Sequence, residues 1–116
     1  MRIVCTGSRG WTDEATIQRR FRALSKGRGT HIIVGEARGA DEMVALEALR
    51  RGFTLSVATA DWERHGKRAG PIRNRQMLDL KPDLVLAFQR GDSPGTKDTI
   101  NEARRRGLPL EIHWRP

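Results

Sequence analysis

Residues 3–11 read IVCTGSRGW: a short apolar run, residues 3–6, passes directly into a turn that holds two glycines, a hydroxyl, a guanidinium and an indole. An apolar run without polar alternation is typical of a strand that is covered on both faces of a parallel sheet. Runs of the same character recur at residues 31–34, 53–58, 84–88 and 110–113. We therefore expect five parallel strands whose following turns meet at one edge of the sheet.

Amphipathic segments separate these runs. Helical spacing of apolar residues predicts helices at residues 12–26, 40–51, 71–80 and 96–106, and in the second of them the apolar positions are Met43, Ala45, Leu46 and Leu49. Residues 59–70 are polar and longer than a usual connection, which predicts a loop. The alternation predicts an α/β fold: a single Rossmann-like three-layer sandwich of about five parallel strands with helices on both faces.

The length and the cysteine content limit the class of protein. The chain has 116 residues, which fits one domain spanning residues 1–116. Its only cysteine, Cys5, lies in an apolar run and is expected in the core of a reduced, cytoplasmic protein. The run before Gly7 is too short for a signal peptide or a membrane span, so no membrane partner is expected. Three scattered histidines and one cysteine show no metal-ligand spacing, and we expect neither a metal nor a cofactor.

The charge favours anionic partners. Lys and Arg number 22 against 14 acidic residues, a net charge of +8. The run of Arg104, Arg105 and Arg106 falls in the last turn of a predicted helix, where cations complement the helix dipole. That structural role is favoured over a nucleic-acid-binding patch.

Three glycine-containing turns follow predicted strands, at residues 7–11, 35–41 and 90–96. Each leads into a predicted helix, whose first N–H groups and positive dipole end attract anions. Neither a P-loop nor a strict dinucleotide fingerprint is present. Three such turns at one sheet edge, each of them with an arginine, predict a phosphate site.

The same residues resemble the YspA-like branch of the SLOG superfamily of Rossmann-like nucleotide-binding domains. The resemblance is carried by four ordered motifs: residues 7–11, Gly35-x-Ala37-x-Gly39-Ala40-Asp41, residues 61–77 and residues 87–109. More distant relatives are the Lonely Guy phosphoribohydrolases and the DprA proteins. Residues 73–77 are similar to the Arg-Lys-x-x-Met element of the Lonely Guy enzymes. Residues 92–99 are similar to their glycine-rich loop, whose glutamate position falls on Thr99.

The resemblance implies a nucleotide or phosphoribosyl ligand and a set of site residues. Arg73 and Asp41 are the candidate catalytic residues, and the implied ligand-binding residues are Gly7, Ser8, Arg9, Trp11, Gly35, Arg38, Gly39, Asp41, Trp62, Arg73, Asn74, Gly95 and Thr96. Trp11 either stacks on a base or packs beside the first helix, and Trp62 either stacks or packs as a lid.

The sequence does not decide whether the protein hydrolyses its ligand. Hydrolysis of an N-glycosidic bond needs a carboxylate, which Thr99 lacks. Asp98 would point about 100° away from Thr99 on a helix, so Asp41, Glu36 or Asp61 would have to serve. The possibilities are a hydrolase of a nucleotide or an ADP-ribose-like compound, a sensor or sponge without turnover, and a less favoured DprA-like module for single-stranded nucleic acid. A homodimer is possible.

Overall fold

The computed structural model describes residues 1–24 and 29–116. One sheet of five parallel strands lies at its centre, in the order β3-β2-β1-β4-β5. The elements along the chain are β1 (Arg2–Gly7), α1 (Glu14–Leu24), β2 (His31–Gly35), α2 (Ala40–Arg50), β3 (Thr54–Ala58), α3 (Trp62–His65), the 3-10 turn η1 (Gly66–Arg68), α4 (Ala69–Asp79), β4 (Leu84–Arg90), α5 (Pro94–Arg105) and β5 (Leu110–Arg115). The predicted α/β sandwich is confirmed.

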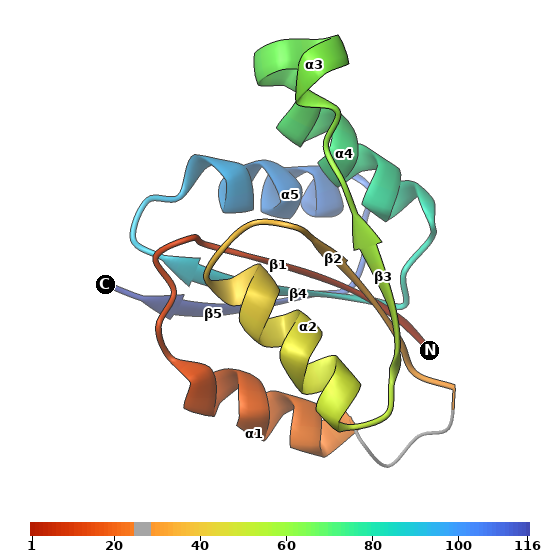
Figure 1. Ribbon diagram of the computed structural model, residues 1–116, viewed down its shortest axis with the longest axis vertical. Coiled ribbons are helices and arrows are strands. Elements are labelled where there is room, and N and C mark those ends of the chain that lie inside the picture. The colour runs from red at the N-terminus through yellow and green to blue at the C-terminus, as the bar shows by residue number, and fades with distance from the viewer. Residues whose placement is uncertain (25–28) are drawn as a thin grey trace.

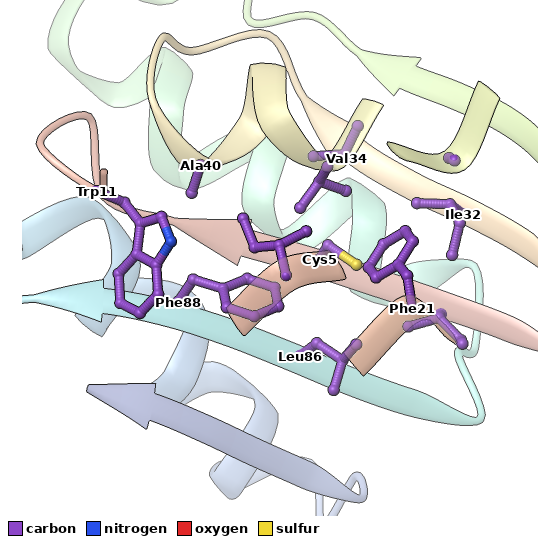
Figure 2. Packing of buried hydrophobic residues seen from close by; sticks show 12 residues of the cluster. Cys5, Trp11, Phe21, Ile32, Val34, Ala40, Leu86 and Phe88 are labelled. Carbon is purple, nitrogen blue, oxygen red and sulfur yellow. The ribbon is translucent and has the colours of Figure 1, made fainter. Parts of the chain in front are cut away.

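Helices cover both faces of the sheet. Helices α1 and α2 lie on one face, and α4 and α5 lie on the other (Figure 1). The larger apolar cluster lies beneath α1 and α2 and includes Cys5, Trp11, Phe21 and Phe88 (Figure 2). The smaller one lies between the opposite face and α4 and α5, and Met77 belongs to it. No helix of the described residues is long and apolar enough to cross a bilayer.

Alternate residues of β1 explain how one strand serves both clusters. Ile3 and Cys5 point to the α1 and α2 side, whereas Val4 points to α4 and α5. All three are fully buried, as the unbroken apolar run predicted. The edge strands β3 and β5 are mostly half-exposed or exposed, because each has a neighbour on one side only.

Two details differ from the sequence-based expectation. Residues 59–70 are not a loop: only 59–61 are non-helical, and α3, η1 and α4 follow without a break. In α2 the buried apolar face is Ala40, Val44 and Ala48, whereas Leu46 and Leu49 are exposed. The sequence pattern predicted the wrong face of α2, because leucine is more apolar than alanine and the two exposed leucines dominated the pattern.

The ends of two predicted helices also move. The last helix begins at Pro94, two residues before the predicted start, because proline is well suited to the first helical position. Helix α1 ends at Leu24 among the described residues, and the predicted positions Ser25 and Lys26 lie outside them.

Candidate functional site

A cavity of about 580 Å³ opens at the carboxyl ends of the central strands. The chain leaves β1 towards α1 on one face and leaves β4 towards α5 on the other (Figure 1). Such a divergence of neighbouring strands opens a crevice at the edge of a parallel sheet. Predicted site residues on its walls are Gly7, Ser8, Arg9, Gly35, Asp41, Trp62, Arg73, Asn74, Gly95 and Thr96. The strand-following turns therefore converge as the sequence suggested.

Three hydroxyls form a chain on one wall. The Oγ atom of Ser8 lies 3.4 Å from Oγ1 of Thr96, which lies 3.0 Å from Oγ of Ser93. The backbone N–H of Arg90 donates to Ser8 Oγ at 2.9 Å. Two contacts among three hydroxyls use two of the three O–H protons, so one remains to donate to a ligand.

The hydroxyl chain lies at the N-terminus of α5. Pro94, Gly95 and Thr96 form the first turn of this helix, and all three border the cavity. The N–H groups of a first helical turn have no partner within the helix and lie at its positive dipole end. This wall therefore carries donors of the kind that can hold an anion.

Asp41 and Arg73 meet across Gly35. A Cβ added at Gly35 would lie 2.8 Å from Asp41 Oδ2 and 2.7 Å from Arg73 Nη1. Only a glycine leaves room for both side chains at this point of β2. Asp41 comes from the first turn of α2, and its Oδ2 accepts the backbone N–H of Ala37 at 3.1 Å.

The environment of Asp41 favours its neutral form. The residue is 6% exposed, and burial raises the pKa of Asp41 to about 6. The Ala37 hydrogen bond and the charges of Arg73 and Arg9 lower this pKa and offset part of the effect of burial. Asp41 is thus a carboxyl group on a cavity wall that exchanges a proton near neutral pH.

A polar network extends from α4 to α5. Arg73 Nε donates to Asn74 Oδ1 at 3.0 Å, and Asn74 Nδ2 donates to Asp98 Oδ2 at 3.2 Å. Arg75 Nη1 contacts the same Asp98 oxygen at 3.3 Å. Asn74 is 4% exposed and is itself held by Asp98, so its hydrogen bond fixes the orientation of the Arg73 guanidinium.

Asp98 was missed as a site residue by the sequence reasoning. Asp98 borders the cavity, whereas Thr99 is 0% exposed and does not. The two side chains do diverge by about 100°, but it is Asp98 that faces the site. The start of α5 at Pro94 is the signal that would have identified Asp98. Gly95 and Asp98 are both in the helix, three residues apart, and therefore share a helix face. A carboxylate from α5 is therefore present one position before the residue aligned with the Lonely Guy acid.

Trp11 and Gly39 do not reach the cavity. Trp11 is 1% exposed, and its ring packs edge-on against Phe88 with centroids 5.6 Å apart, so the packing alternative describes it (Figure 2). Gly39 has φ +76°, and a Cβ there would overlap the Arg9 carbonyl oxygen. Its role is to let the β1–α1 and β2–α2 turns touch, and Ala40 N–H donates to Ser8 O at 3.2 Å beside it.

The remaining predicted residues lie at or away from the rim. Trp62 is 50% exposed and borders the opening, so its ring is free to meet a ligand. Arg38 borders a smaller hollow beside the main cavity. Asp61 caps α3 by accepting Arg64 N–H, and Glu36 accepts Ala60 N–H, so neither borders the main cavity.

Two further groups can be placed. Cys5 is 0% exposed, and burial raises the pKa of its thiol well above the ordinary range, which confirms Cys5 as a core residue. In the part of the chain that the structure describes, no three His, Cys, Asp or Glu side chains gather in the way a metal site requires.

A family model matches residues 1–65, and it describes the YspA, cpYpsA-related SLOG family, YAcAr. The chain belongs to this family. The resemblance inferred from the motifs is confirmed. The matched residues run from β1 to the end of α3, so the walls that come from α4 and α5 lie beyond them.

Relatives extend the comparison over the whole chain. The Gene 61 protein of Mycobacterium phage D29 is 37% identical over 119 residues, which cover 94% of this chain and 93% of that protein. The crystal structure of TM1055, a structural-genomics target, has a TM-score of 0.71 at 19% identity over 94% of this chain and 71% of that one. The DNA processing protein A (DprA) from Streptococcus pneumoniae has a TM-score of 0.63 at 15% identity over 95% of this chain and 58% of that one. The two solved structures share the fold.

Proposed function

We propose that this SLOG-family protein binds a nucleotide or another ribose phosphate in the main cavity. One observation carries the proposal: the hydroxyl chain of Ser8, Ser93 and Thr96 and the first turn of α5 face a space that Arg73 also borders. Hydroxyls, helix N–H groups and a guanidinium are the donors that bind phosphate in proteins. A volume of about 580 Å³ fits a ligand of nucleotide size.

Each wall then meets one part of the ligand. The phosphate lies at the N-terminus of α5, where the spare hydroxyl proton is. The sugar hydroxyls face Asp41, which accepts a hydrogen bond when ionised and donates one when protonated. The exposed indole of Trp62 stacks on the base at the rim.

Hydrolysis of the ligand is a second candidate function, and the position of Asp41 favours it. A carboxyl group whose pKa is raised to about 6 can protonate a leaving group near neutral pH. Asp98 on the opposite wall can assist an attacking water or stabilise positive charge on the sugar. Binding without release of a base would support the sensor or sponge instead.

The arginine distribution favours a small ligand over nucleic acid. Arg105 and Arg106 both pair with Glu102, and Arg106 also contacts Asp79 at 2.8 Å. Arg20 pairs with Glu111 at 2.6 Å. These cations are engaged within the fold and do not make a basic stripe that could follow a phosphate backbone.

Titration calorimetry with ribonucleoside 5′-monophosphates tests the proposal. We expect binding by the native protein and a loss of at least about tenfold in affinity in Arg73→Ala, since a charge-assisted hydrogen bond is removed. Arg104→Ala removes the same charge from an exposed position at the far end of α5 and should leave affinity unchanged. Chromatography of the incubated nucleotides shows whether a free base is released. Failure of every phosphoribosyl compound to bind would refute the proposal.

A further inference from the structure

A second hollow of about 340 Å³ adjoins the main cavity. Both spaces are bordered by Arg9, Ala37, Trp62 and Arg73. Glu36 and Arg38 border the second hollow alone. Because the two share these residues, a ligand in the main cavity can extend past Trp62 into the second hollow.

The second hollow is strongly positive. Three guanidinium groups border it, from Arg9, Arg38 and Arg73, against the single carboxylate of Glu36. Glu36 Oε1 accepts the backbone N–H of Ala60 at 3.1 Å and so is held against the turn after β3. Neither Arg9 nor Arg38 forms an ion pair with any other residue that the structure describes.

The fold fixes the backbone positions of these two arginines. Arg9 lies in the turn after β1, and Arg38 lies in the turn after β2. Gly39 brings the two turns into contact, since any side chain there would overlap the Arg9 carbonyl. The hydrogen bond from Ala40 N–H to Ser8 O also joins the two turns. The two unpaired cations are thus carried on turns that are joined to each other.

We propose that the second hollow binds a second phosphate group, so that the ligand class is a nucleoside bisphosphate, with phosphates at two separate positions of the sugar. This inference rests on the proposed function, because the first phosphate occupies the N-terminus of α5. The planar fork of arginine suits phosphate oxygens, and Arg9 and Arg38 together supply two forks without a competing ion pair. Arg73 borders both spaces and stands between the two phosphates.

Calorimetry can separate the two phosphates. The probes are the common ribonucleoside 5′-monophosphates, the matching 5′-diphosphates and the matching 3′,5′-bisphosphates. We expect a bisphosphate to bind at least about tenfold more tightly than its monophosphate, and Arg38→Gln to remove this gain while leaving monophosphate affinity unchanged. Arg38→Lys should restore part of the gain, and Arg104→Gln, at an exposed position remote from the site, should preserve all of it.

Each other result contradicts the inference. Equal affinity for monophosphates and bisphosphates overturns the inference and leaves the proposed function intact. A gain in affinity for the 5′-diphosphates alone would mean that the two bound phosphates are adjacent, and this result also overturns the inference. A loss of monophosphate affinity in Arg38→Gln assigns Arg38 to the first phosphate instead. Failure of every probe to bind overturns the inference together with the proposed function. Arg38 is exposed, so the variants should fold, and thermal unfolding checks that they do.

Discussion

Asp41 and Glu102 are two carboxylates with equally small exposed fractions, and their pKa values move in opposite directions. Asp41 is 6% exposed and Glu102 is 5% exposed. Burial raises the pKa of Asp41 to about 6, whereas hydrogen bonds from Arg105 and Arg106 lower the pKa of Glu102 to about 2. A small exposed fraction therefore does not by itself decide the pKa of a carboxyl group. Asp41 lies deep in the protein, where desolvation dominates, whereas Glu102 lies near the surface and is covered by the arginines that pair with it.

The comparison separates a structural carboxylate, Glu102, from a candidate functional one, Asp41. Glu102 receives guanidinium groups that belong to its own helix end, and its charge is fully matched there. Asp41 receives one backbone N–H, and its nearest cation, Arg73, also donates to Asn74. A buried carboxyl group left without a complete partner lowers stability, which is typical of groups that are kept for chemistry.

The largest effect in this comparison should come from Asp41→Asn. The folded protein holds the Asp41 proton until its pKa of about 6, whereas an unfolded chain releases it near the ordinary 3.8. Raising the pH through this window therefore destabilises the native protein but not the variant. We expect Asp41→Asn to be more stable by up to about 3 kcal/mol at pH 7, with little difference below pH 4.

Urea unfolding of both proteins at several pH values between 4 and 7 measures this difference. Asparagine keeps an oxygen that can accept the Ala37 N–H, so the hydrogen bond itself is preserved. A stability difference that does not change with pH would contradict the assignment of Asp41 as a buried, proton-exchanging group.

Glu102→Gln should have a smaller effect of opposite sign. The substitution removes the negative charge that Arg105 and Arg106 share, so the variant should melt at a lower temperature at pH 7. The native advantage is present above the ordinary pKa of 4.5 and is lost as the pH falls towards about 2, so the melting temperatures should converge in acid. Thermal scans across that range decide it, with Glu42→Gln as the control that removes the same charge from an exposed position of α2. Unequal melting temperatures that persist at pH 2 would point to packing instead.

Thr99→Val should have the smallest effect. Thr99 Oγ1 is buried, and no described group forms a hydrogen bond with it. Valine has nearly the same shape without the unpartnered hydroxyl, and we expect a gain of about 1 kcal/mol in stability. Nucleotide affinity should not change, whereas Asp98→Asn should change it because Asp98 borders the cavity. Calorimetry on the two variants compares the positions. A loss of binding in Thr99→Val would show that Thr99, the position aligned with the Lonely Guy glutamate, contributes to binding.

The fold could be predicted from the sequence because its signals are local. The run at residues 3–6 is fully or almost fully buried, and its four counterparts all form strands of one parallel sheet. The turns at Ser8 and Gly95 were placed at the cavity because the ends of parallel strands meet at one edge. These inferences needed only periodicity and topology.

Side-chain direction could not be predicted in the same way. Whether Trp11 faces a ligand or the core depends on Phe88, which is distant in sequence. The role of Asp98 depends on where α5 begins, because Gly95 and Asp98 share a helix face only when the helix includes both residues. The opposite pKa shifts of Asp41 and Glu102 could not be predicted from the sequence either, since they follow from surroundings that only the fold brings together.

The strand order β3-β2-β1-β4-β5 has a consequence for biosynthesis. A ribosome that has released only the first 60 residues has supplied β1, β2 and β3, but not the walls that α4 and α5 contribute. The cavity is complete only after β4 has paired with β1, so a half-made chain lacks it. A ligand bound in the complete cavity would touch both halves of the polypeptide and would have to leave before the halves could separate.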